Sequence, residues 1–219
     1  MQFLLDNLSA LLVASSVLLL GIVARTDSSQ VAIEQTAHYS SRSQVQSFTD
    51  WLQEDLTQIG ENYGSGQTAF VMPTQSTSGL TRGMTTAFQF HRDSLRTVSG
   101  VTTTYRVFIR YRLVSRGTVR VDNEPSPVPL FGVERDEQTV PVTTDSVTPT
   151  SSGWVRAGGG PGTLSQFVIA PHDRDGQPTT DLARTDFLRI RLSFVPPYDN
   201  EHRELHELHW GTTVGIRPF

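Results

Sequence analysis

Three histidines near the C-terminus are the first residues whose types and spacing could do chemistry. His202, His206 and His209 lie within "HRELHELH", and on a helix they would share one face, where three imidazoles could hold zinc. On a strand, His202 and His206 would point one way and His209 the other. The segment leads into an alternating pattern that ends in "TTVGIRPF", and it lacks the HExxH order of zinc proteases. We therefore favour a strand here over a metal site.

Two further motifs contain groups that bind ligands in other proteins. "HDRDG" places Asp173 and Asp175 before Gly176, but its carboxylates at the EF-hand spacing are incomplete, so an acidic turn is favoured over a calcium loop. "AGGGPG" lacks the Lys-Ser/Thr end of a P-loop. No spacing assembles a Ser-His-Asp set, although such triads are defined by geometry. We predict no catalytic residue, metal or cofactor, and we expect that the protein is not an enzyme.

Composition narrows the class of protein further. The chain has 219 residues, 37% of them apolar, which is enough to build one domain with an appendage. The formal net charge is -4 and all 18 basic residues are arginine, so no clustered basic excess predicts binding to nucleic acid. Cysteine is absent, which excludes disulfides and thiolate chemistry.

The first structural element is indicated by an uncharged stretch near the N-terminus, residues 7–24, which lies between Asp6 and Arg25. A helix needs about 20 mostly apolar residues to cross a bilayer, so this stretch predicts a membrane span. A cleaved signal peptide is the first alternative, but it would begin with basic residues, which "MQFLLDNLS" lacks. A buried core helix is the second alternative. The stretch is apolar on all sides, which suits lipid or a helix bundle better.

Helical signals continue after the span. Residues 26–59 contain neither proline nor glycine, and Gly60 then favours a helix end. A break is an open alternative in the serine-rich residues 26–44. We predict one N-terminal helix over residues 1–60, with a membrane or filament-core part over 1–25 and an amphipathic part over 26–60. The residues expected to pack on a sheet are Val45, Phe48, Leu52, Leu56 and Ile59.

Residues 61–219 predict an antiparallel β-rich domain, so the fold class is α+β. Strands are expected at "QTAFVM", "TTAFQFH", "QFVIA", "FLRIRLSFV" and "LHWGTTVGIRPF". In "TYRVFIRYRLV" one face is apolar and the other is mostly arginine. Ser115 to Gly117 predicts a turn into a further strand, "TVRVD". Residues 123–162 are rich in proline, glycine, serine and threonine. They predict an irregular connection or a surface flap, with "GWVRAGGGPG" as its most flexible piece.

Taken together, these stretches resemble the type IV pilin superfamily, and within it the minor pilins and pseudopilins of type IV pilus and type II secretion systems. The resemblance covers nearly the whole chain: the apolar helix running into "LQEDLTQIG", then "TTAFQFHRD", "TYRVFIRYRLVSRGTVRV", "HDRDGQPTTDLARTDFLRIRLSFV" and "TTVGIRP". That family has a basic leader ending in glycine and a glutamate a few residues into the mature chain. "MQFLLD" has no such leader, and Asp6 is the nearest equivalent of the glutamate.

The resemblance implies a structural subunit of a pilus-like filament. Its helix would be anchored in the inner membrane before assembly and would then pack against copies of itself or other pilin-like subunits in an extracellular filament. The residues that it assigns to assembly are Asp6, Leu11, Leu12, Val17, Leu18, Leu19 and Leu20. The alternative is a single-pass, membrane-anchored accessory subunit of an envelope or virion-membrane complex. An anchored hydrolase is a third alternative.

Overall fold

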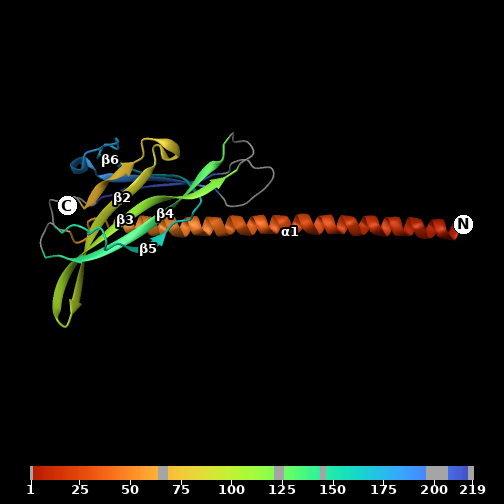
Figure 1. The fold of residues 1–219 in the computed structure, drawn as a ribbon, viewed down its shortest axis with the longest axis horizontal. Coiled ribbons are helices and arrows are strands. Elements are labelled where there is room, and N and C mark those ends of the chain that lie inside the picture. The colour runs from red at the N-terminus through yellow and green to blue at the C-terminus, as the bar shows by residue number, and fades with distance from the viewer. Residues whose placement is uncertain (1, 64–68, 121–125, 144–146, 196–206, 217–219) are drawn as a thin grey trace. The chain divides into compact units, whose positions relative to one another are not determined.

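The structure is a computed structural model that describes residues 2–63, 69–120, 126–143, 147–195 and 207–216 (Figure 1). The chain divides into two compact units, Met1–Arg42 and Ser43–Phe219. One helix, α1 (Gln2–Thr57), supplies the whole described part of the first unit and continues into the second. The second unit adds an antiparallel sheet of eight strands, which confirms the α+β class with an N-terminal helix packed on a sheet.

Helix α1 runs without a break through the serine-rich stretch where a break was an open alternative. Hydroxyl groups along it donate hydrogen bonds to backbone carbonyls one turn earlier: Ser16 Oγ to Leu12 O at 2.8 Å and Thr26 Oγ1 to Ile22 O at 2.9 Å. These bonds satisfy the hydroxyls within the helix itself. The serines and threonines are therefore compatible with apolar surroundings.

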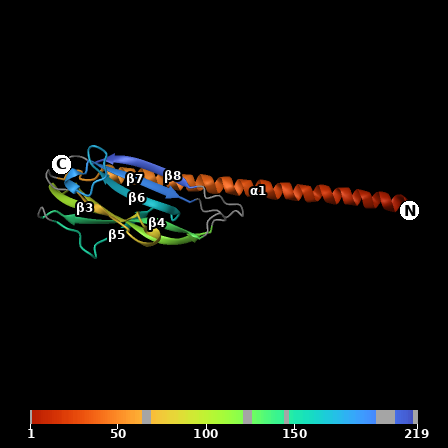
Figure 2. The same cartoon turned by 90° about the horizontal axis from the view of Figure 1, so that it is seen from above.

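The sheet has the order β1-β2-β3-β4-β6-β7-β8, with β5 also paired to β4. Figure 2 shows β6, β7 and β8 side by side. The strands and two short 3-10 helices are β1 (Phe70–Gln75), η1 (Gly79–Thr81), β2 (Thr85–Val98), β3 (Val101–Val119), β4 (Val128–Pro141), β5 (Val155–Gly159), β6 (Leu164–His172), η2 (Leu182–Arg184), β7 (Phe187–Phe194) and β8 (Leu208–Gly215).

Both halves of the sheet share one core. The inward side chains of β1–β4 and of β6–β8 are buried in the same apolar cluster, together with the C-terminal part of α1. Backbone pairing between β4 and β6 consists of one residue pair, Phe131 with Leu164. Thr85 on β2 adds a side-chain link, because its Oγ1 accepts a hydrogen bond from the backbone N–H of Ile169 on β6 at 2.9 Å. Buried side chains, rather than a long hydrogen-bonded ladder, therefore hold the two halves together.

Two sequence predictions are wrong in the middle of the chain. The irregular connection expected over residues 123–162 contains β4, which pairs with β3 along fourteen residues, and β5. The prolines within β4 are its second and last residues, Pro129 and Pro141, and near the ends of a strand they interrupt the hydrogen-bonded ladder least. The turn expected at Ser115 to Gly117 is a β-bulge, so "TVRVD" begins as the end of β3 and is not a separate strand.

The glycine-rich segment is packed rather than flexible. β5 pairs with β4, and Gly158 and Gly160 lie against aromatic side chains of α1. A Cβ built on Gly158 would lie 3.1 Å from the Trp51 ring, and one on Gly160 would lie 2.7 Å from the Phe48 ring. A side chain at position 160 would occupy the space of the Phe48 ring, whereas one at position 158 would be in tight contact with Trp51.

We expect Gly160→Ala to lower the free energy of unfolding by about 1–3 kcal/mol, the usual cost of overpacking a filled site. Unfolding in denaturant can be followed by tryptophan fluorescence, because all three tryptophans lie in the second unit. Ala157→Val, at an exposed position of β5, is the matched control and should change stability by less than about 0.5 kcal/mol. Equal effects of the two substitutions would show that Phe48 does not limit the space at Gly160.

Candidate functional site

The first candidate surface is the apolar part of α1. Six residues predicted to take part in assembly have exposed fractions between 61% and 71%: Leu11, Leu12, Val17, Leu18, Leu19 and Leu20. Asp6 belongs to the helix, but its side chain lies outside the described part of the structure. Among the described residues, α1 is the one helix long and apolar enough to cross a membrane. An uncovered apolar surface of this length favours contact with lipid or with other protein.

The second candidate surface is where the C-terminal part of α1 meets the sheet. Of the residues predicted to pack there, Phe48, Leu52, Leu56 and Ile59 are buried in the core. Val45 is partly buried and packs against the same core. The opposite side of this part of the helix is polar and exposed. The apolar stripe thus joins α1 to the β-rich unit.

A buried ion pair reinforces this contact. Asp55 on α1 is 5% exposed and accepts two hydrogen bonds from Arg135 on β4, from Nε at 2.6 Å and from Nη2 at 3.2 Å. The hydroxyl of Tyr111 on β3 donates a third hydrogen bond to Asp55. Arg135 also bonds to Glu137 at 2.9 Å, and its guanidinium lies over the Trp51 ring at 5.3 Å. This cluster connects the helix to two strands at once.

The cluster is stable as a charged pair beside a neutral phenol. Burial raises the pKa of Tyr111 well above its usual value, and the charge of Asp55 raises it further, so the hydroxyl remains a donor. Burial alone would lower the pKa of Arg135, but its hydrogen bonds to Asp55 and the charge of Asp55 raise it overall. The sequence reasoning missed this cluster. Its signal was an acidic residue three positions after Leu52 and four before Ile59, within the apolar stripe.

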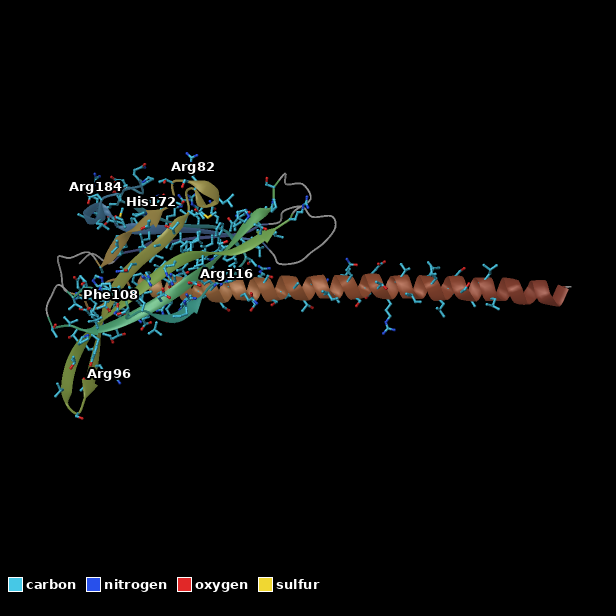
Figure 3. All side chains as sticks on the ribbon, in the orientation of Figure 1. Arg82, Arg96, Phe108, Arg116, His172 and Arg184 are labelled. Carbon is cyan, nitrogen blue, oxygen red and sulfur yellow. The ribbon has the colours of Figure 1, made fainter. Side chains whose placement is uncertain are left out.

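The third candidate surface lies on the outer face of β3, β4 and β5. Strand alternation directs Tyr111 and Arg135 toward the helix, so their neighbours point to the opposite face. The arginines there form what we call the cationic strip: Arg110, Arg112, Arg116 and Arg156 (Arg116 is labelled in Figure 3). The mostly arginine face predicted for β3 supplied two of them, Arg110 and Arg112, whereas Arg116 was expected in a turn.

Two carboxylates of β4 hold the cationic strip in place. Asp136 accepts hydrogen bonds from Arg110 Nη2 at 2.9 Å, Arg112 Nε at 2.9 Å and Arg156 Nε at 3.1 Å. Glu134 bonds to Arg112, Arg116 and Arg156. Although burial raises the pKa of Asp136, the hydrogen bonds from its three arginines lower it overall, so the carboxylate stays ionised. The result is a continuous charge network across three strands.

A histidine on the same outer face is held neutral. His91 on β2 packs between the rings of Tyr63, at 4.5 Å, and Phe108, at 5.5 Å. Its buried Nε2 has no hydrogen-bond partner among the described atoms. Burial first, and then the charge of Arg106, lower the pKa of His91 from 6.5 to about 4, although the charge of Asp93, which forms a buried ion pair with Arg106, partly opposes this. Protonation of this ring would therefore oppose folding.

We expect His91 to make stability fall as the pH drops from 6.5 to about 4. The pKa of His91 is lower in the folded chain than in the unfolded chain, so the unfolded chain binds the proton first as the pH falls. Binding the proton stabilises the unfolded chain in this window, and the free energy of unfolding decreases. For a partly exposed ring the loss should be roughly 2 kcal/mol. Denaturant unfolding at several pH values should show this fall in the wild type, and a flatter profile in His91→Phe. Parallel profiles would remove His91 as the cause.

Among the residues that the structure describes, those singled out for catalysis or ligand binding do not assemble into such a site. Ser193 Oγ lies 2.9 Å from His209 Nδ1, but Ser193 is 2% exposed, and Glu207 approaches the same nitrogen at 3.9 Å instead of the other one. A Ser-His-Asp relay needs the acid and the serine on opposite ring nitrogens. Within the described residues no three potential metal ligands gather.

The histidine and aspartate motifs follow the favoured interpretations where they are described. His209 lies on β8, an outward position of a strand, while His202 and His206 lie outside the described residues. Asp173 Oδ1 accepts hydrogen bonds from the backbone N–H groups of Asp175, at 3.1 Å, and Gln177, at 2.8 Å. The predicted acidic turn is confirmed, since this carboxylate closes the turn itself.

Comparison of the chain with models of protein families, with curated proteins and with solved structures finds no match.

Proposed function

We propose that this protein is a structural subunit of a pilus-like extracellular filament, held in the membrane by α1 before assembly. The observation that carries the proposal is that the two parts of one helix have different surroundings. The first part of α1 is apolar and uncovered, whereas its last part is built into the core of the β-rich unit. The helix therefore joins a surface suited to association to the β-rich unit, which we call the head.

The physics of apolar helices allows the surroundings of α1 to change. Leucine and valine side chains are about as well accommodated by lipid tails as by other helices, so packing detail decides between the two. Moving the apolar part from lipid into a bundle of identical helices would keep it out of water throughout. The buried pair of Asp55 and Arg135 would keep the head attached to the helix during that move.

A membrane-anchored accessory subunit of an envelope or virion-membrane complex is the second candidate. The same uncovered helix and compact head favour it, because an anchor needs no copies of itself. Stoichiometry separates the two candidates. A filament subunit should be recovered in many copies from fibres sheared off the cell surface, whereas an accessory subunit should remain with the membranes after shearing.

We expect Asp6→Ala to reduce the yield of sheared fibres at least fivefold and to leave the amount of membrane-bound protein unchanged. A carboxylate beside an apolar run is costly when buried without a cationic partner, so in a packed filament it should pair with a neighbouring subunit and set the stagger between helices. Immunoblots of sheared and membrane fractions measure both quantities. Asp6→Glu, which keeps the charge, is the control.

Normal fibre yield from Asp6→Ala would exclude Asp6 from assembly. Loss of the membrane-bound protein as well would give Asp6 an anchoring role at the headgroup region instead.

A further inference from the structure

The cationic strip exposes its arginines and covers its carboxylates. The side chains of Arg112, Arg116 and Arg156 are 40%, 47% and 48% exposed, whereas those of Glu134 and Asp136 are 13% and 5% exposed. With Arg110, four guanidinium groups stand over two carboxylates, which leaves a net charge of +2. A partner that approached this face would meet guanidinium groups first.

The arginines of the strip are also held rigidly. The Arg110 guanidinium stacks on the Trp154 ring at 4.2 Å. Arg116 lies across two glycines: a Cβ built on Gly132 would lie 2.8 Å from Arg116 Nε, and one on Gly162 would lie 3.3 Å from Arg116 Cγ. Side chains that are ordered before binding lose less entropy on association. The strip is therefore prepared for an anionic partner.

The same chain carries an acidic surface on α1. Asp50 and Glu54 are exposed, one turn apart, and the segment Ser43–Thr57 contains no basic residue. Neither carboxylate forms an ion pair with any described residue, although Asp50 accepts a hydrogen bond from Gln46 at 2.8 Å. Like charges at this spacing destabilise a helix, and a cationic partner would remove that cost. We call Asp50 and Glu54 the acidic pair.

We propose that the cationic strip of one copy binds the acidic pair on α1 of a second copy. Subtracting the +2 of the strip from the chain's net charge of -4 leaves -6 on the rest of the molecule, so another copy is an electrostatically attractive partner. The inference rests on the proposed filament function and names a contact within it.

The positions of the two surfaces decide the kind of assembly. The strip lies on the face of β3 and β4 opposite to the one that receives α1, because Arg110 and Tyr111 alternate along the same strand. One copy can therefore offer its acidic pair to one neighbour and its strip to another. Such a head-to-tail contact is heterologous, and it repeats along a filament instead of closing into a symmetric dimer.

Disulfide trapping tests the contact in the full chain, because the protein has no cysteine of its own. Glu54→Cys and Arg116→Cys are made in separate copies, which are co-reconstituted in lipid vesicles and oxidised. The expected result is a disulfide-linked pair of one copy of each variant, at least tenfold more abundant than the pair formed by Glu54→Cys with Arg189→Cys. Arg189 is the control because it lies on the outer face of β7, away from the strip. Equal yields would overturn the proposal.

Charge reversal supplies a second measurement that does not depend on trapping. Asp50→Arg with Glu54→Arg reverses the acidic pair at exposed positions, and Arg116→Glu with Arg156→Gln changes the strip from +2 to -1. Each double variant alone should lose at least tenfold of its self-association in vesicles, measured by energy transfer between labelled copies. Mixing the two should restore association, since the reversed pair then meets the reversed strip.

The outcomes separate this contact from the proposed filament. Normal fibres from both charge variants would overturn the contact and leave the filament standing. Trapped pairs in membranes without any wild-type fibres would support the contact and refute the filament. Unchanged self-association, with binding of an acidic polysaccharide such as alginate that is lost in Arg116→Glu with Arg156→Gln, would overturn the contact and make the strip a polyanion site.

Discussion

Replacing Asp55 with alanine is expected to lower the free energy of unfolding of the β-rich unit by about 3–5 kcal/mol. The substitution would leave Arg135 buried without its two hydrogen bonds from Nε and Nη2, and the Tyr111 hydroxyl without its acceptor. Loss of a proton would not relieve this buried charge, because an arginine guanidinium stays protonated in proteins. Denaturant unfolding of the detergent-solubilised chain, followed by tryptophan fluorescence, measures the change.

Two controls distinguish the ion pair from a general loss of helix contacts. Glu54→Ala removes the neighbouring carboxylate, which is exposed and has no ion-pair partner among the described residues, and should change stability by less than about 0.5 kcal/mol. Asp55→Leu combined with Arg135→Met removes both charges, and should recover much of the loss because no charge then remains buried alone. A double variant less stable than Asp55→Ala would contradict this account.

Leu52→Ala is expected to cost about 2–5 kcal/mol, because it would remove a large side chain from a filled site and leave a cavity. Leu52 is 0% exposed and belongs to the core formed by α1 and the sheet. For a unit of this size each kcal/mol lowers the melting temperature by roughly 2–4 °C. Thermal unfolding monitored by near-ultraviolet circular dichroism should therefore show a clear decrease.

Gln53→Ala is the matched control for Leu52→Ala, since it lies on the exposed side of the same helical turn. It should leave the melting temperature nearly unchanged. Similar decreases for both substitutions would mean that the wrong side of α1 has been assigned to the sheet.

Periodicity was sufficient to predict the main elements. Apolar residues at helical spacing indicated the part of α1 that packs on the sheet, and strict alternation in "TYRVFIRYRLV" indicated both the buried face and the arginine face of β3. These signals are local, because each of the two elements has one buried and one exposed side, and the spacing of apolar residues within the element shows which side is buried. The α+β class could therefore be predicted from the sequence.

Other features depended on partners distant in the chain. The run from Glu134 to Glu137 looks like solvent-exposed sequence, but Asp136 is buried by arginines of β3 and β5. This part of β4 could not be recognised from hydrophobicity, because charge pairing replaces apolar burial over residues 134–137. Gly158 and Gly160 likewise indicate flexibility until the rings of Trp51 and Phe48 are placed against them. The structure of these segments therefore depends on contacts with residues distant in the chain and not on local composition.

The single backbone pair between β4 and β6 determines the order in which the second unit should fold. Within β2–β4 and within β6–β8, neighbouring strands are also neighbours in sequence, so each set can form by closing short loops. Phe131 and Leu164 add almost nothing to join the sets, and the two must associate through burial of their apolar faces. Arg135 becomes buried in an ion pair only when α1 brings Asp55 to it. Although α1 is synthesised first, its ion pair with β4 should thus form after β4 has paired with β3, when Arg135 is already in place.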